Sequence, residues 1–185
     1  MANIEQAFET AIEHWRLKGG VGTTLIRPPF NDLVLLLGVL QRFYNKSPTR
    51  RTLIIVNDYQ DRMNIVNYLT GQPDEDNNKE FRRLIDDKTI SILSRDYYNK
   101  LWRPSRTLTV FYHPTEFSGS DKTSLEHSTF KLVLLNKLIP NINILNSCCP
   151  LLEDFSQAAS DELRTTLPVE ETRIPVYFEE DSEDF

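Results

Sequence analysis

The sequence predicts a single α/β domain of three layers, with a mainly parallel β-sheet and helices on both of its faces. Two observations predict this fold class. Short apolar runs rich in β-branched residues alternate along the chain with amphipathic segments of helical period. The chain also has 185 residues, enough to bury a substantial core without disulfides or a structural metal. Such alternation favours parallel strands joined by crossover helices.

The first three elements are predicted from periodicity and capping residues. Apolar residues at helical spacing indicate a helix over residues 3–17, which ends at Gly19-Gly20. A β-branched run indicates a strand over 21–26. Asn31-Asp32 provides capping side chains for a helix over 33–44, whose first half is almost wholly apolar. We expect that helix to be buried against the sheet.

The middle of the chain continues the same alternation. The run over 51–57 is typical of a central parallel strand that is covered on both faces. Asp58 then opens a helix over 58–70, and Gly71 fits its end. A polar loop and a further helix over 78–86 follow.

The later elements are predicted in the same way. They are a strand over 89–93, a short helix over 94–101, a strong strand over 107–112, a helix over 123–139 and a last strand over 141–146. Ligands of doubly wound sheets usually bind beyond the carboxyl ends of the strands. A site is therefore expected at that edge.

The end of the chain differs from the rest in charge. Residues 150–164 are predicted as a helix or turn, and we divide the chain into a domain over 1–166 and an acidic tail or linker over 167–185. This tail holds seven acidic residues against Arg173, and the remainder has twenty of each sign. A strand-like piece at 174–178 is either solvated with the rest or binds a partner. A neutral body gives little support for nucleic-acid binding.

Composition excludes several classes of function. No apolar run is long enough to span a membrane, and the N-terminus mixes acidic residues through an amphipathic pattern, unlike a signal peptide. The expected location is therefore intracellular. Cys148 and Cys149 are adjacent and are predicted to be reduced. Three scattered histidines and no C-x-x-C pair predict no metal site, and we expect no cofactor.

Two local strings carry a resemblance to a known family. They are Gln6, Ala11, Ile12 and Trp15 in the opening helix, and Leu53-Ile54-Ile55-Val56-Asn57-Asp58 at the second strand. With the order of elements, they resemble the first RecA-like lobe of superfamily-two helicases and chromatin-remodeller-type translocases over residues 4–155. The resemblance implies a RecA-like fold and three nucleotide-site motifs at strand ends.

The first implied motif, the phosphate loop, departs from the family. Its matching positions are Pro28, Pro29, Phe30, Asn31, Asp32 and Leu33. A working loop uses glycine backbone N–H groups and a lysine to hold phosphate. The two prolines remove two N–H donors, and Asp32 reverses the charge at the lysine's place. The sequence therefore predicts that this loop does not hold a phosphate in the family's way.

The second motif departs similarly. The acidic motif, which holds magnesium in the family, matches Tyr112, His113, Pro114 and Thr115, and no carboxylate stands there. His113, with no visible carboxylate partner, is interpreted as structural. The third motif, a coupling loop of small residues after the last strand, resembles Ser147, Cys148, Cys149 and Pro150. An ordinary strand end with a proline stop gives the same pattern.

Two weaker patterns remain. A serine-nucleophile site at Ser118 and His127 is disfavoured because the G-x-S-x-G elbow is absent. A basic-aromatic patch for single-stranded nucleic acid would comprise Tyr97, Tyr98, Trp102, Arg103 and Arg106. The alternative for this patch is a solvated face with core aromatics.

These observations predict a catalytically silent helicase-like domain without catalytic residues. It would act as a binding or assembly module for a protein partner or second helicase-type lobe, or for nucleic acid, with no membrane partner. One alternative is the N-terminal ATPase lobe of a longer DNA or RNA translocase. An unrelated α/β domain with convergent alternation is another.

Overall fold

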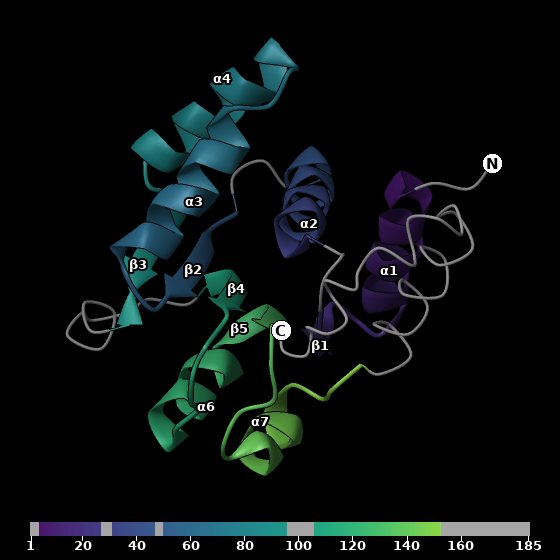
Figure 1. Cartoon of the computed structure of the whole chain (residues 1–185), viewed down its shortest axis with the longest axis vertical. Coiled ribbons are helices and arrows are strands. Elements are labelled where there is room, and N and C mark those ends of the chain that lie inside the picture. The colour runs from purple at the N-terminus through teal and green to yellow at the C-terminus, as the bar shows by residue number, and fades with distance from the viewer. Residues whose placement is uncertain (1–3, 27–30, 47–49, 96–105, 153–185) are drawn as a thin grey trace, which may run out of the picture.

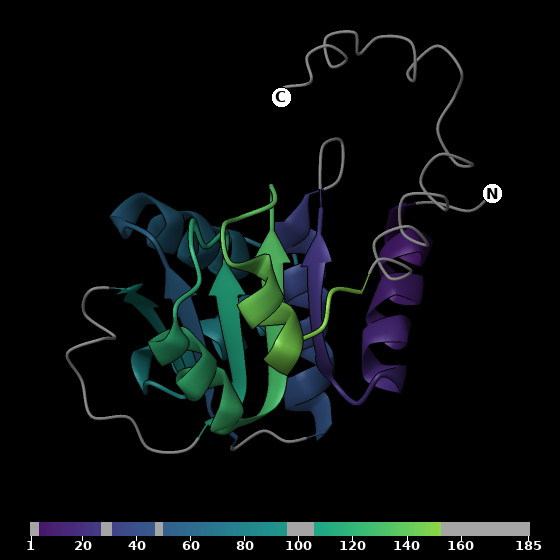
Figure 2. The same ribbon diagram turned by 90° about the horizontal axis from the view of Figure 1, so that it is seen from below.

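The computed structural model describes residues 4–26, 31–46, 50–95 and 106–152. These residues form a five-stranded sheet in the order β1-β5-β4-β2-β3, and all neighbouring strands are parallel. The strands are β1 (Val21–Leu25), β2 (Thr52–Val56), β3 (Ile90–Ser94), β4 (Arg106–Tyr112) and β5 (Ser128–Leu135). Figure 2 shows their carboxyl ends at one common edge.

Helices cover both faces of the sheet, as the sequence predicts. On one face lie α1 (Ile4–Leu17), α2 (Asp32–Lys46), α3 (Tyr59–Thr70) and α4 (Glu75–Asp86). On the other face lie α6 (Gly119–Glu126) and α7 (Ile142–Cys148) (Figure 1). The predicted three-layer α/β fold is therefore confirmed.

The two faces of the sheet have separate cores because side chains alternate along each strand. In β2, Ile54 and Val56 pack with the helices α1 to α4. Leu53 and Ile55 instead pack with α6 and α7. Every residue of β2 is buried, which explains why its last four residues form a continuous apolar run and do not alternate with polar residues.

The sheet also continues beyond β1. The backbone N–H of Thr23 donates to the carbonyl of Pro150 at 2.8 Å, and the N–H of Leu152 donates to the carbonyl of Thr23 at 2.7 Å. Leu151 forms a parallel bridge with Thr23. The segment after α7 therefore covers the outer edge of β1.

Two predicted elements are wrong. The helix predicted over 123–139 is instead α6 followed by the strand β5, and the strand predicted over 141–146 is instead the helix α7. The apolar run in β5 lies between β1 and β4, and four consecutive residues at its end are buried. A short buried run of this kind does not show by periodicity whether it is a helix or a strand, so pairing decided it.

Other predictions fall outside the described residues. They are most of the helix over 94–101, most of the segment over 150–164, and the acidic tail over 167–185. The division of the chain at residue 166 therefore stays a prediction.

Gly20 fixes the turn between α1 and β1. Its φ of +71° lies in the left-handed region, as does that of Gly19 at +83°, and both confirm the predicted helix end. A Cβ on Gly20 would lie 2.3 Å from Cδ1 of Phe130. The carbonyl of Gly20 also accepts the N–H of Lys131 at 2.8 Å, which joins this turn to β5.

We expect Gly20→Ala to lower the free energy of unfolding by about 2 kcal/mol or more, because it combines left-handed strain with overpacking against a core ring. Gly119→Ala is the matched control, since a Cβ at Gly119 meets nothing within 4 Å. Urea unfolding of both variants tests this, and equal stability of the two would contradict it.

Candidate functional site

The described residues that face one another at the carboxyl edge come from three elements. Asp32 begins α2, Asn57 follows β2, and Tyr112 and His113 lie at the end of β4. Sequence reasoning placed these residues in separate motifs. The structure brings Asp32 together with Tyr112 and His113, which are 80 and 81 residues away in the chain.

Asp32 is the centre of this cluster. It is 8% exposed, and its Oδ2 forms an ion-pair contact with Nε2 of His113. The Tyr112 hydroxyl donates to Oδ1 of Asp32 at 3.4 Å. A buried carboxylate with two partners is satisfied within the chain. The carboxylate partner that the sequence did not reveal for His113 is thus Asp32.

His113 is held by its backbone as well as by its ring. Its φ is 51°, which is uncommon for a residue other than glycine. The backbone N–H of His113 donates to the carbonyl of Leu134 at 2.8 Å. The backbone carbonyl of His113 accepts a hydrogen bond from Nδ2 of Asn57 at 2.5 Å. The imidazole stacks on Tyr112 with ring centroids 4.0 Å apart. These contacts explain how the left-handed backbone is maintained.

The N-terminus of α2 is occupied by oxygen atoms of the chain itself. The backbone N–H of Leu33 donates to Oδ1 of Asn31 at 2.9 Å, which confirms the predicted capping role of Asn31. Asp32 lies in the first turn, where the helix macrodipole favours negative charge. A helix N-terminus attracts phosphate for the same reason. A phosphate here would meet the carboxylate of Asp32.

Further carboxylates lie close to this cluster. Burial raises the pKa of Asp61, and the negative charges of Asp58 and Asp32 add to the rise while His113 opposes it. Burial also raises the pKa of the Tyr112 phenol, and the carboxylate of Asp32 adds to that effect. Among the described residues of this edge, the carboxylates of Asp32, Asp58 and Asp61 therefore influence one another.

The expected place of an acidic motif depends on which strand lies beside β1, and that strand is β5. A carboxylate that shares magnesium with a loop after β1 would follow the neighbouring strand, because the carboxyl ends of adjacent parallel strands lie side by side. Asn136 and Lys137 follow β5. Sequence analysis missed these positions because it predicted a helix there. Neither residue supplies a carboxylate.

The small residues at the end of α7 have a structural role. Oγ1 of Thr23 donates to the carbonyl of Cys149 at 2.8 Å, which holds the end of α7 against β1. Both cysteines are free, as predicted. Burial raises the pKa of the Cys149 thiol to about 12, so the thiol is protonated at neutral pH. The coupling-loop assignment of Ser147 to Pro150 stays a prediction.

Ser118 caps α6 and does not form a nucleophile site. Its Oγ accepts the backbone N–H of Asp121 at 3.3 Å, and its own backbone N–H donates to Oδ2 of Asp121 at 2.8 Å, which together form a capping box. Asp121 is 1% exposed and also pairs with Arg95. His127 ends the same helix and is exposed. These polar groups therefore hold the loop after β4 against the end of β3.

Several predicted site residues cannot be placed. Pro28, Pro29 and Phe30 lie outside the described residues. The same holds for Tyr97, Tyr98, Trp102 and Arg103, and only the backbone of Arg106 is described, in β4. The nucleic-acid patch therefore stays a prediction.

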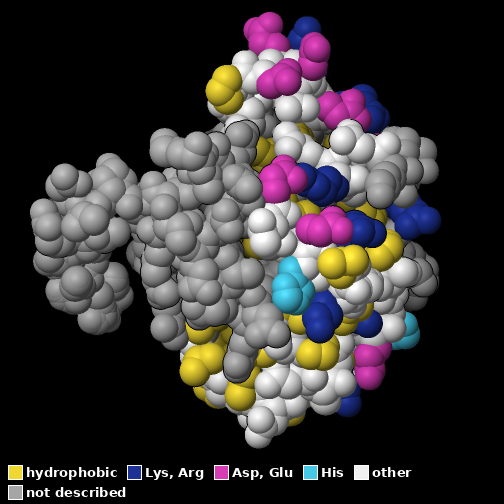
Figure 3. All heavy atoms as spheres, turned by 90° about the vertical axis from the view of Figure 1, so that its right-hand side faces the viewer, with side chains coloured by type: hydrophobic (Ala, Val, Ile, Leu, Met, Phe, Trp, Pro, Cys, Tyr) yellow, Lys and Arg dark blue, Asp and Glu magenta, His cyan; other side chains and the backbone are white. Residues whose placement is uncertain are grey.

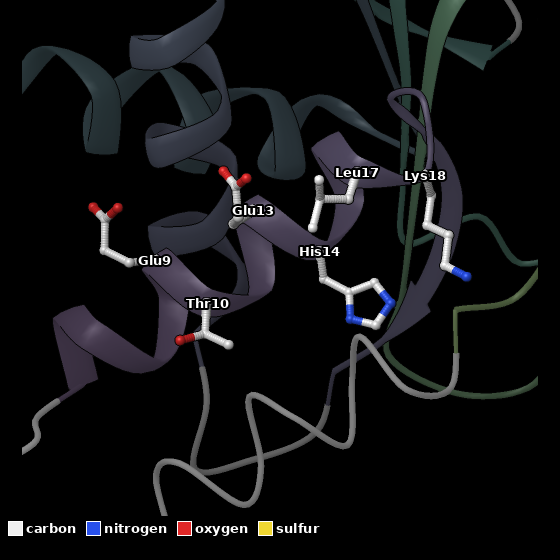
Figure 4. Close-up of a pocket in the computed structure, with 6 residues that line it drawn as sticks. All are labelled: Glu9, Thr10, Glu13, His14, Leu17 and Lys18. Carbon is white, nitrogen blue, oxygen red and sulfur yellow. The ribbon is translucent and has the colours of Figure 1, made fainter.

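A hollow on the outer face of α1 is a weaker candidate. It is lined by Glu9, Thr10, Glu13, His14, Leu17 and Lys18 (Figure 4). All six residues belong to one helix and the turn after it, and Glu13 pairs with Arg16. Figure 3 shows acidic and basic side chains interspersed over this face. Binding sites normally combine groups from several elements, and this hollow does not.

In the part of the chain that the structure describes, no three His, Cys, Asp or Glu side chains lie close enough to share a metal ion. No described helix is long and apolar enough to cross a membrane.

Comparisons with known proteins bear on the fold. No protein-family model matches the chain, and no curated protein matches it by sequence. Among solved structures, the chain is similar to the Sulfolobus solfataricus SWI2/SNF2 ATPase core in complex with dsDNA. That match has 10% identity and a TM-score of 0.53, and it covers 91% of this chain and 40% of the other.

A second solved structure is the Pyrococcus furiosus Hef helicase domain. It has 16% identity and a TM-score of 0.45, with 64% of this chain and 28% of the other covered. The chain thus spans less than half the length of either structure. The match to the ATPase core shows the predicted RecA-like helicase-type fold, and at 10% identity it shows the fold alone.

One prediction of the site geometry concerns the contact between Asp32 and His113. We expect a double-mutant cycle of Asp32→Ala and His113→Ala to give a coupling of about 1 kcal/mol or more, since Asp32 is buried and has few partners. The exposed pair Glu80–Arg83 is the control and is expected to show no measurable coupling. Urea unfolding measures the free energies of unfolding of all variants. Equal coupling energies for the pair Asp32–His113 and the control pair would contradict the prediction.

Another prediction concerns how the stability of the chain changes at alkaline pH. Because the folded-state pKa of Tyr112 is raised, its contribution to stability is full below the ordinary phenol value of about 10 and is lost as pH rises above it. Tyr112→Phe is expected to reduce this loss. Tyr59→Phe, at an exposed phenol, is expected to leave it unchanged. Unfolding free energies measured across this range test both, and an unaltered pH slope in Tyr112→Phe would contradict the prediction.

Proposed function

We propose that this chain is a catalytically silent, intracellular helicase-like domain that acts as a binding or assembly module for a macromolecular partner. The observation that carries this proposal is the position of Asp32 at the N-terminus of α2. There its carboxylate already contacts His113 and Tyr112. The chain thus provides its own anion where a RecA-like lobe would hold a phosphate.

The chemistry of phosphoryl transfer supports the same proposal. That reaction requires a cradle of N–H groups, a cation on the phosphates and carboxylates that hold magnesium. The sequence places Pro28 and Pro29 in the loop before α2, and prolines have no N–H. Neither His113 after β4 nor Asn136 after β5 provides a carboxylate. Two separate requirements, the cradle of N–H groups and the carboxylates, are therefore unmet.

The alternative is the N-terminal ATPase lobe of a longer DNA or RNA translocase. The partial coverage of the solved ATPase core favours this alternative, since one lobe spans only part of such a core. The sequence speaks against it, because no Gly-x-x-x-x-Gly-Lys string occurs in the 185 residues.

The partner of a silent domain is either a protein or a nucleic acid. The solved ATPase core is in complex with dsDNA, which supports nucleic acid as a candidate. Binding to DNA through phosphates weakens steeply with added salt. Titration with single- and double-stranded DNA at low and high salt therefore distinguishes the two classes.

The proposal predicts that Mg-ATP leaves the thermal unfolding of the chain unchanged. A ligand at about 100 times its Kd stabilises a folded protein by about 2.7 kcal/mol, which gives a clear rise in Tm. The parent and Asp32→Lys are heated with and without Mg-ATP.

Asp58→Lys is the matched control for added positive charge, since Asp58 is an exposed carboxylate at the same edge. We expect no shift in the parent or in the control variant. A reproducible rise of Tm in the parent would refute catalytic silence and favour the ATPase alternative.

A further inference from the structure

The strand β3 lies at one end of the sheet. β2 pairs with one side of β3, and no described strand pairs with its other side. At the opposite end of the sheet, Leu151 covers the outer side of β1 (Figure 2). The five residues of β3, Ile90–Ser94, include no charged side chain. Edge strands of this composition tend to pair with other strands unless a charged side chain protects them.

The backbone groups of Ile90 and Ile92 face away from β2. Successive residues of a strand direct their N–H and C=O groups to opposite sides. The carbonyl of Thr89 accepts the N–H of Thr52 from β2 at 2.9 Å, so Thr89 faces β2. Ile90 and Ile92 lie one and three residues further along, and they therefore direct their N–H and C=O groups to the outer side of the sheet.

Arg62 of α3 occupies part of this outer side. Its Nε donates to the carbonyl of Ile92 at 3.1 Å, and the arginine is half-buried. No other described residue bonds to the outward groups of Ile90 and Ile92. The charge that β3 itself lacks is thus supplied by the neighbouring helix.

The outer sides of β3 in two copies of the chain are complementary. In an antiparallel pair related by a two-fold axis, Ile90 of one copy can lie opposite Ile92 of the other, and the two residues then exchange both of their N–H···O=C bonds. Half of these bonds use the carbonyl of Ile92, which is the acceptor that Arg62 occupies. In this register, Ser91 of one copy lies directly opposite Ser91 of the other.

We infer that Arg62 keeps the outer edge of β3 from pairing with the same edge of a second copy of this chain. Pairing requires the carbonyl of Ile92 to give up its bond to Arg62. It also brings the guanidinium groups of both copies to one interface, where like charges repel. This role of Arg62 goes beyond the proposed function and does not depend on catalytic silence.

Sedimentation velocity of the full chain tests this role. We expect the parent to sediment as a monomer. Arg62→Met keeps most of the apolar stem and removes the donor, so the carbonyl of Ile92 becomes available in each copy. It is expected to dimerise at least about tenfold more tightly than the parent, because each of the two copies gains an acceptor. Arg82→Met is the matched control, since Arg82 of α4 also donates to a backbone carbonyl, that of Thr70, but at the end of a helix.

A second substitution separates pairing through β3 from unspecific aggregation of a poorly folded variant. Ser91→Lys is added to Arg62→Met, because like charges directly opposite each other on paired strands are destabilising. We expect this double variant to sediment as a monomer. Added salt is expected to restore part of the dimer, since it screens exposed charges.

Three results would overturn the role of Arg62. One is an Arg62→Met variant that is as monomeric as the parent and the Arg82→Met control. Another is a dimer of Arg62→Met that Ser91→Lys leaves intact, since its interface would lie elsewhere. The third is a parent that already forms a dimer which Ser91→Lys dissociates, because Arg62 would then not prevent pairing.

Discussion

The carboxylate of Asp32 is the interaction on which the carboxyl edge of this domain depends. It lies at the N-terminus of α2, where the helix dipole favours an anion, and it contacts His113 and Tyr112 from β4. His113 is in turn fixed to β2 through Asn57 and to β5 through Leu134. One buried charge therefore links a helix to three strands.

This arrangement explains how the N-terminus of α2 is satisfied by groups of the chain itself. In a phosphate-binding domain, the ligand satisfies the N-terminal N–H groups of the helix. Here Asn31 accepts the N–H of Leu33, and Asp32 supplies the negative charge. These contacts are local and electrostatic, and neither Asn31 nor Asp32 belongs to the hydrophobic cores on the two faces of the sheet.

The fold depends on the apolar cores and not on the polar carboxyl edge. The two cores consist of apolar side chains that point alternately to the two faces of the strands. The polar groups of the carboxyl edge follow the ends of these strands. A change at the edge therefore alters binding while the architecture is kept. This physical independence is why a RecA-like fold by itself does not specify an activity.

The sequence by itself determined the α/β class, the described helices and strands from α1 to β4 and the unusual chemistry of the loop before α2. Periodicity, capping residues and the absence of a proline N–H are local properties, so they can be read along the chain. Prediction from the sequence was wrong for β5 and α7, since a short buried run fits either a helix or a strand. Pairing of β5 between β1 and β4 decided the matter.

Only the tertiary structure decided which residues meet at the candidate site. Asp32 and His113 are 81 residues apart, and no local pattern connects them. His113 therefore lacked a visible partner in the sequence, and Asn136 was overlooked because its strand was not recognised. Contacts of this kind arise from strand order, which depends on the free energy of the whole packed sheet and not on any one segment.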